Sequence, residues 1–250
     1  MTVETATYIS DLNSTYPASG NSLVEGDDHI RLLKSTIKAS LPNIAGAVTP
    51  THTELNYVDG VTQSIQPVLS AMGLWFLSEQ SASTSATIDF TSGISSTYEE
   101  YELHIINAVP DSGTNNVPWL YTSADAGGTW PSSSGDYDYT YSQSLGTTTT
   151  VANGSTTATK IILAAAGVDS TTAYGGLSAV IRFYNPAGTT HHKRFNWSGS
   201  LADSTTNGNL ASFHGTGSRA ATEAINGIRF QFSANNILSG KFKLYGVRKS

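Results

Sequence analysis

Cysteine is absent from this 250-residue chain, so neither a disulfide nor thiol chemistry is available to it. Charged residues make up only 13% of the sequence, about half the share in ordinary soluble domains. No apolar stretch approaches the roughly 20 residues that a membrane-spanning helix needs. The N-terminus has neither the basic region nor the apolar run of a signal peptide, and we expect a protein made without an export signal.

Motifs for common catalytic chemistry are also missing. The chain has no phosphate-binding glycine loop, no His-Glu-x-x-His zinc motif and no nucleophile elbow. We therefore expect no enzyme activity, no cofactor and no metal. A net charge of −6 argues against nucleic acid or an anionic membrane as the main partner.

Serine, threonine, asparagine and glycine supply most of the polarity instead, and these residues suit strands, turns and hydrogen-bonding surfaces. Twelve Tyr, eight Phe and four Trp provide enough aromatic area for a substantial core. The composition therefore favours a folded, mainly β protein over a disordered one.

An amphipathic helix is predicted near Ser22–Leu41. Ser22 and Glu25 have capping-box spacing, acidic residues precede basic ones in the order that the helix dipole favours, and Pro42 ends the pattern. Its apolar stripe at helical spacing consists of Ile30, Leu33, Ile37 and Leu41. Such a stripe is too small to form a domain alone, so we expect it to dock on another chain or another protein.

A second apolar stripe follows the helix. Thr51 and Glu54, which have the same capping-box spacing, precede it. Its apolar residues recur at steps of three and four, as in a heptad: Leu55, Val58, Val61, Ile65, Val68 and Met72. Asp59-Gly60 and Pro67 interrupt the pattern. We expect a short, broken helical bundle between copies of the chain; the alternative is one helix packed on its own domain.

From Leu74 onward, short alternating runs between turn residues predict an antiparallel β-sandwich or jelly roll. Residues 142–159, almost wholly small and polar, are predicted to form a long loop or a weak hairpin. The expected strands are Ala86–Phe90, Tyr98–Ala108, Pro118–Ser123, Tyr137–Tyr141, Lys160–Ala166, Leu177–Tyr184, Lys193–Ser200, Asn209–His214, Ile228–Phe232 and Lys241–Val247.

Aromatic and acidic residues crowd one stretch of this region, where Trp130, Tyr137, Tyr139, Asp136 and Asp138 form a candidate glycan site. Flat rings stack on sugar faces and carboxylates accept hydroxyl hydrogens, so this mixture suits carbohydrate. The alternative is that the rings belong to the core, because tyrosines spaced by two share one strand face. Asp125 with Asp136 and Asp138 is also a conceivable calcium site, but solvated loop carboxylates are the favoured interpretation.

A small basic run, His191-His192-Lys193-Arg194, follows a turn signal. It can contact anionic sugars or phosphates on a cell surface, although a solvated turn is the favoured interpretation. Adjacent histidines point to opposite faces of a strand, so they are poor joint metal ligands.

Several of these segments resemble the appendage proteins of tailed bacteriophages, namely tail fibres, spikes and related virion fibres. The resemblance is carried by EGDDHIRLLKSTIK at residues 25–38, LPNI at 41–44 and ELNYVDGVTQSIQ at 54–66. It covers residues 7–70 well and continues more weakly in INGIRFQFS at 225–233 and GKFKLYGV at 240–247. The middle of the chain, about residues 75–220, carries no motif that extends the resemblance.

The resemblance implies three parts: a virion-anchoring arm and helix over residues 1–48, a helical oligomerisation stalk over 49–74, and a receptor-binding β-sandwich tip over 75–250. The expected protein is made in the bacterial cytoplasm, joins the tail or capsid of a virion, and binds a host cell-surface polysaccharide without cleaving it. A homotrimer is the default, and a fivefold capsid site would take a pentamer. The alternatives are a purely structural decoration protein and, less favoured, a polysaccharide-trimming enzyme.

Overall fold

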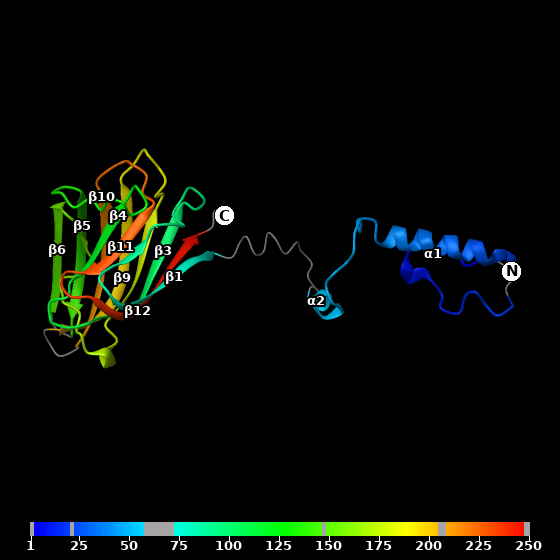
Figure 1. Ribbon diagram of the computed structural model, residues 1–250, viewed down its shortest axis with the longest axis horizontal. Coiled ribbons are helices and arrows are strands. Elements are labelled where there is room, and N and C mark those ends of the chain that lie inside the picture. The colour runs from blue at the N-terminus through cyan, green and yellow to red at the C-terminus, as the bar shows by residue number, and fades with distance from the viewer. Residues whose placement is uncertain (1–2, 21–22, 58–72, 147–148, 205–208, 248–250) are drawn as a thin grey trace. The chain divides into compact units, whose positions relative to one another are not determined.

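The computed structural model describes residues 3–20, 23–57, 73–146, 149–204 and 209–247. The chain divides into two compact units, unit 1 over residues 1–62 and unit 2 over residues 63–250 (Figure 1). Unit 1 contains the two described α-helices, and unit 2 contains all the described strands and a 3₁₀ turn at Thr172–Tyr174. The mainly β character with antiparallel pairing, expected from the composition and the alternating runs, is confirmed.

Unit 1 is built on helix α1, Gly26–Ser40, which a 3₁₀ turn at Leu23–Glu25 precedes. The predicted helix is therefore present, but its α-helical part starts later than Ser22, which lies outside the described residues. Asp27 and Asp28 in the first turn and Lys38 in the last complement the helix dipole. The helix ends at Leu41, whose backbone N–H still donates to the carbonyl of Ile37 at 3.0 Å.

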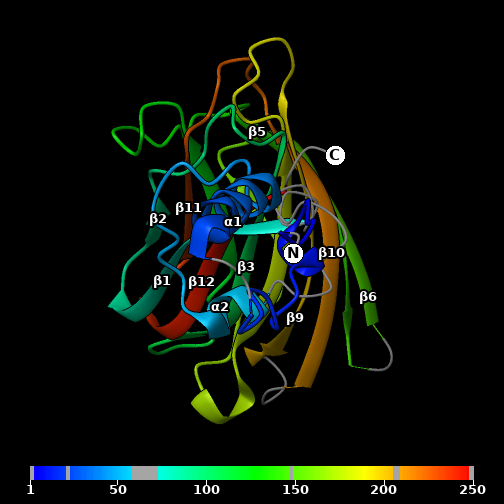
Figure 2. The same cartoon turned by 90° about the vertical axis from the view of Figure 1, so that its right-hand side faces the viewer.

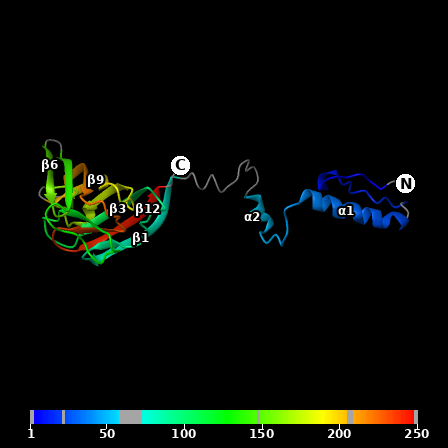
Figure 3. The same ribbon diagram turned by 90° about the horizontal axis from the view of Figure 1, so that it is seen from above.

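The N-terminal segment, including the 3₁₀ turn Ile9–Asp11, runs alongside α1 (Figure 3). The backbone N–H of Ile9 donates to Ser40 Oγ at 2.8 Å, and the rings of Tyr16 and His29 lie 6.5 Å apart. His29 and Thr36 are the buried residues of α1. The arm thus covers a largely polar side of the helix.

A short helix α2, His52–Asn56, begins at the second predicted capping box. The Glu54 N–H donates to Thr51 Oγ1 at 3.3 Å, and the Thr51 N–H donates to Glu54 Oε2 at 2.7 Å. These two bonds satisfy backbone donors that would otherwise have no partner, so the spacing of the two side chains sets the start of the helix.

Two antiparallel sheets form unit 2. The large sheet has the strand order β1-β12-β3-β8-β9-β10-β5-β6 and the small sheet has the order β2-β11-β4-β7. Figure 2 shows them from a second side, with β2 and β11 on the left of the view and β10 and β6 on the right. The strands are β1 Leu74–Ser85, β2 Ile88–Phe90, β3 Glu100–Pro110, β4 Pro118–Ser123, β5 Tyr137–Leu145, β6 Thr149–Ala158, β7 Ile161–Ile162, β8 Leu177–Tyr184, β9 Lys193–Asp203, β10 Asn209–Arg219, β11 Gly227–Phe232 and β12 Ile237–Val247.

One apolar core joins the two sheets. The inward residues of both sheets belong to a single buried cluster, and the rings of Phe230 on β11 and Phe242 on β12 lie 5.3 Å apart. Each of these strands alternates: Phe242 and Leu244 are buried, whereas Lys243 between them is only partly so. The period of two in the sequence therefore selects the buried face of each strand.

Each of the ten predicted strands overlaps a strand of the structure, but two strands were not predicted. β1 pairs with β12, and residues 149–158 form β6, which pairs antiparallel with β5. This pairing corresponds to the hairpin alternative for residues 142–159 rather than to a long loop. Both unpredicted strands are edges of the large sheet.

Glycine is required at Gly215, on β10 beneath the buried ring of Trp197. A Cβ atom there would lie 2.4 Å from Trp197 Cζ2 and 2.6 Å from the carbonyl oxygen of Thr140. The indole instead fills the space and its Nε1–H donates to the carbonyl of Leu163 at 2.8 Å. The ring of Trp197 thereby fills the space over Gly215 and Gly217 on the inward side of β10.

We expect Phe230→Ala to lower the free energy of unfolding of unit 2 by about 3–5 kcal/mol, because it removes a fully buried ring that touches both sheets. Leu210→Ala is the control, since that side chain is 70% exposed, and it should change stability by less than about 0.5 kcal/mol. Urea unfolding followed by aromatic fluorescence measures both. Equal effects of the two substitutions would contradict the placement of the core.

Candidate functional site

The outward face of the large sheet carries a polar lattice, which we name the hydroxyl face. Along β10 the inward positions Ala211 and Phe213 are buried, and the outward positions Ser212, His214 and Thr216 between and after them are exposed. Strands β5, β8 and β9 show the same alternation. The sequence therefore places polar side chains on one face of four neighbouring strands.

Strand register aligns these side chains in rows across β8, β9, β10 and β5. Strands lie about 4.8 Å apart and alternate residues about 6.7 Å apart, so the rows form a regular grid. The rows are Tyr184–Arg194–Ser218–Asp138, Arg182–Asn196–Thr216–Thr140, Val180–Ser198–His214–Ser142 and Ser178–Ser200–Ser212–Ser144.

Three open hollows adjoin on this face. The first, about 330 Å³, is lined by Val180, Arg182, Tyr184, Asn196, Trp197 and Ser198. The second, about 380 Å³, is lined by residues of β5, β6 and β10 around His214. The third, about 300 Å³, includes Asp138, Ser155 and Arg194. The second and third share Thr140 and Thr216, whose row continues through Asn196 into the first.

This lining suits a ligand rich in hydroxyl groups. Serine and threonine hydroxyls donate and accept hydrogen bonds, amides do both through different atoms, and guanidinium groups only donate. The Tyr184 ring, whose hydroxyl accepts from Asn196 Nδ2 at 3.3 Å, adds a partly exposed flat surface beside them. Asp138 is the one carboxylate among the described residues lining the three hollows, so they contain no pair of acids for glycoside hydrolysis.

A charged cluster borders the first hollow on β3. Glu102 is 5% exposed and lies between His104, whose Nε2 is 2.7 Å from Glu102 Oε2, and Arg182, whose Nε donates to Glu102 Oε1 at 2.9 Å. Burial by itself raises the pKa of Glu102, but the bonds to His104 and Arg182 outweigh it, and the net pKa lies below its ordinary value. Arg182 also pairs with Glu100 at 2.9 Å, so its charge is already neutralised.

The predicted aromatic and acidic residues do not converge on one site. Tyr137 is fully buried and its hydroxyl accepts from the Thr122 N–H at 3.0 Å, so the glycan-stacking role expected for Tyr137 is wrong and the core alternative holds. The position of Tyr137 follows from the strand period. Residues 137, 139 and 141 lie on the same face of β5, and that face is the inward one. Tyr139 is stacked on Tyr141 at 6.0 Å and packs against the core, but it is only partly buried and also contributes to the lining of the third hollow beside Asp138.

The two aspartates of the predicted site have different surroundings. Asp136 pairs with Arg219 at 2.9 Å and accepts from the Ser133 N–H at 2.6 Å, so its carboxylate braces a loop. Asp138 lies on the hydroxyl face, where its Oδ1 accepts from Ser218 Oγ at 2.6 Å. Asp138 alone of the pair lines a hollow of this face.

Trp130 lies with the small sheet instead. The Arg229 guanidinium lies 4.4 Å from the centre of its ring, and Arg229 is held in turn by Asp89 through two bonds of 2.7 and 2.6 Å. Trp130, in the loop between β4 and β5, therefore packs against the small sheet, whereas Asp138 is on β5 of the large sheet. The ring remains partly exposed, so Trp130 stays a separate candidate for sugar stacking.

Of the basic run at residues 191–194, only Lys193 and Arg194 belong to β9, and they lie on its two opposite faces. Lys193 is 1% exposed and its Nζ donates to the carbonyls of His191 and Thr222 at 2.7 and 3.1 Å, which fastens two loops together. Desolvation lowers the pKa of this buried amine. Arg194 points outward and lines the third hollow. A shared basic patch of Lys193 and Arg194 is therefore absent.

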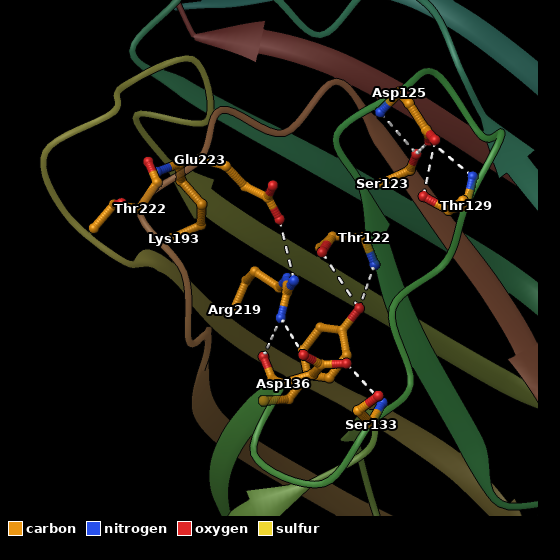
Figure 4. Close-up of polar contacts among 11 residues, drawn as sticks. Thr122, Ser123, Asp125, Thr129, Ser133, Asp136, Lys193, Arg219, Thr222 and Glu223 are labelled. Carbon is orange, nitrogen blue, oxygen red and sulfur yellow. Dashed lines mark hydrogen bonds and ion pairs between the residues drawn. The ribbon is translucent and has the colours of Figure 1, made fainter.

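The loops at this end of unit 2 are held by polar contacts (Figure 4). Arg219 lies between Asp136 and Glu223, with ion pairs of 2.9 and 3.1 Å. Nearby, hydrogen bonds from Ser123 and Thr129 lower the pKa of Asp125 to about 2. Asp125 and Asp136 thus have separate partners, although both lie in the loop between β4 and β5. No group of three or more metal-ligating side chains is placed to hold an ion among the residues that the structure describes.

The predicted anchoring stripe is exposed on α1. Ile30 is 54% exposed, Leu33 45%, Ile37 50% and Leu41 47%. The N-terminal arm contacts α1 beside this stripe, at His29 and Ser40, and Leu33 at the edge of the stripe lines a hollow with arm residues. Lys34, Lys38 and Ile44 line a hollow of about 360 Å³ along this stripe. An apolar stripe that remains in water while a polar side is covered is the pattern of an unfilled interface.

The predicted stalk residues lie mostly outside the described part of the chain. Leu55 is described and is 46% exposed, whereas Val58, Val61, Ile65 and Met72 fall within residues 58–72. Where description resumes, Leu74, Trp75 and Phe76 at the start of β1 are exposed as well. The stalk therefore remains a prediction. Among the residues described, no helix has the length and apolarity needed to cross a membrane.

Comparison of the chain with protein-family models, with curated proteins and with solved structures returned no match. Alternation of serine and threonine with core residues on β5, β9 and β10 was visible in the sequence. The register that brings Thr140, Asn196 and Thr216 into one row was not, because it depends on which strands are neighbours.

Glu102→Gln tests the charged cluster at the edge of the hydroxyl face. A carboxylate with a lowered pKa stabilises the fold above its unfolded pKa of about 4.3, and this stabilisation is lost as the pH falls through the folded pKa. We expect the variant to be less stable than the parent by roughly 1–3 kcal/mol at pH 7. The difference in unfolding free energy between parent and variant should narrow as the pH falls below about 4.3, the unfolded pKa of a glutamate.

Urea unfolding of unit 2 at pH 7, 5 and 3 provides the measurement. Asp27→Asn is the control, because Asp27 is an exposed carboxylate of unit 1 that pairs with exposed Arg31. It should leave the pH dependence of unit 2 unchanged. A gap between parent and Glu102→Gln that stays constant down to pH 3 would rule out this role for the carboxylate.

Proposed function

We propose that the chain is a virion appendage protein of the phage fibre or spike type. In this proposal α1 and the preceding arm attach the protein to the tail or capsid. Residues 49–74 join identical chains, and unit 2 is a β-sandwich tip that binds a host cell-surface polysaccharide. The protein binds this ligand without cleaving it and needs no cofactor.

The observation that carries the proposal is the contrast between the surfaces of the two units. Unit 1 leaves the apolar stripe of α1 in water, which favours a protein partner. Unit 2 presents four rows of mainly polar side chains with three hollows between them, which favours a polyhydroxylated ligand. One protein interface and one sugar-type surface are what an adsorption protein needs.

Assembly from identical chains is supported by the exposed residues around the predicted stalk. Leu55 before it and Leu74, Trp75 and Phe76 after it are all at least 44% exposed. Burial of these side chains between copies would remove a large apolar area from water. A trimer remains the default and a pentamer the alternative for a capsid fivefold site.

A purely structural decoration protein is the second candidate. The same exposed residues of β1 favour it, because a sheet edge with apolar side chains can pair with a neighbouring protein. The hydroxyl face favours the receptor-binding function instead, since protein interfaces have more aromatic and apolar residues at their centre than this face offers.

Leu33→Asp with Ile37→Asp tests the anchor. Two charges in the stripe should prevent burial against a partner, so incorporation into particles should fall at least tenfold. Ser35→Asp is the matched control, because Ser35 is exposed on α1 outside the stripe. Quantitative immunoblotting of purified virions measures incorporation. Equal incorporation of all three proteins would place the attachment surface elsewhere.

Tyr184→Ala and Trp130→Ala distinguish the two sheets as the site of sugar binding. We expect Tyr184→Ala to weaken binding to host cells by about thirtyfold, the equivalent of about 2 kcal/mol for an aromatic anchor, with the melting temperature nearly unchanged. Trp130→Ala should leave cell binding intact. Binding is measured on intact cells and on cells stripped of surface polysaccharide.

If only Trp130→Ala lost binding while keeping its fold, the sugar-binding site would be assigned to the side of the small sheet. Parent protein that binds stripped and intact cells equally would contradict a polysaccharide receptor and favour the structural alternative.

A further inference from the structure

The third hollow of the hydroxyl face contains one cation, the guanidinium of Arg194. Arg194 is exposed, lies outward on β9, and has no ion pair within the part of the chain that the structure describes. Arg182, the other arginine of the face, is neutralised by Glu100 and Glu102. Arg194 is therefore the guanidinium on this face that is free for a ligand.

Asp138 faces the same hollow. In the register across β9, β10 and β5, Arg194 and Asp138 stand on either side of Ser218, which donates to Asp138 at 2.6 Å. The rest of the lining of this hollow consists of Tyr139, Thr140, Thr216, Gly217 and the β6 residues Ser155 and Thr156. One end thus offers hydrogen-bond donors and positive charge, and the other offers a carboxylate acceptor with neutral hydroxyls around it.

These groups select among ligands by charge. A guanidinium binds a carboxylate through two parallel hydrogen bonds, whereas a carboxylate such as Asp138 accepts from hydroxyl groups and repels other anions. A simple inorganic anion gains from Arg194 but is opposed by Asp138. A sugar unit that carries both a carboxylate and free hydroxyls satisfies both ends.

We propose that the hollow around Arg194 and Asp138 recognises a carboxylate-bearing sugar unit, so that the receptor is an acidic polysaccharide with uronic-acid-type or sialic-acid-type residues. This inference rests on the proposed function and specifies its ligand class. Arg194 binds the sugar carboxylate, and Asp138 accepts from a sugar hydroxyl. Tyr184, in the same row as both, supplies a ring beside the next unit of the chain.

The test uses the full chain and a panel of immobilised bacterial surface polysaccharides of known composition, both acidic and neutral. Every polysaccharide that binds is measured again after its carboxylates have been reduced to alcohols. We expect the binding polysaccharides to contain carboxylates, and reduction to weaken binding at least tenfold. Arg194→Gln should lose about tenfold to a hundredfold on the native polysaccharide and should match the parent on the reduced one.

Two further variants control for charge and fold. Arg194→Lys keeps the charge but not the two-pronged geometry, so it should fall between the parent and Arg194→Gln. Lys241→Gln removes an exposed cation from β12, where it pairs with Glu79 at 3.3 Å, and it should bind like the parent. Melting temperatures of the Arg194 variants should equal that of the parent, because Arg194 makes no ion pair within the described residues.

The outcomes separate this inference from the proposed function. Binding to neutral polysaccharides, or binding that survives carboxyl reduction, overturns the acidic-sugar assignment and leaves a glycan-binding protein. Binding that is lost only after removal of phosphate groups assigns a phosphate-bearing sugar instead and also overturns it. No binding to any polysaccharide overturns the proposed function itself.

Discussion

Burial of the large sheet on one face only is the constraint on which unit 2 depends. The inward residues of its strands share a core with the small sheet, as the contact between Phe230 and Phe242 shows. Every second residue must then meet water, and on β5, β9 and β10 those residues are mostly serine, threonine and asparagine. The same alternation that builds the core therefore builds the candidate binding surface, so the two cannot be positioned independently of each other.

Local patterns in the sequence predicted the interior strands well, because each buries one face and alternates accordingly. β11 and β12 are examples, with Phe230 and Phe242 at inward positions. β1 and β6 were not predicted, and both are edge strands of the large sheet. Their residues are mostly exposed or partly buried, so they carry little periodic signal. They are strands because β12 and β5 offer them hydrogen-bonding partners, and that information lies elsewhere in the chain.

The candidate site was predictable only in part, for a related reason. Crowding of aromatic residues around Trp130 and Tyr137 is a pattern that both cores and sugar sites share, and here the register places Tyr137 inside. Asp138 was among the predicted residues, but its neighbours Arg194 and Thr216 come from strands far away in sequence. On α1 the outcome differs, because a helical stripe is a local property. Ile30, Leu33, Ile37 and Leu41 lie on one side as expected. An arm before the helix was also expected, but its contacts with His29 and Ser40 were not foreseen.

Separation of the two faces of each strand also affects how such a surface can change over evolution. Thr216 lies between Gly215 and Gly217, and its side chain points away from the Trp197 ring that packs over them. A substitution at Thr216 or Ser198 alters the outward chemistry while the packed interior stays as it is. Many sequences can therefore share this interior and differ in their outward rows. A protein of this design can acquire a new ligand preference through single substitutions, without an intermediate that fails to fold.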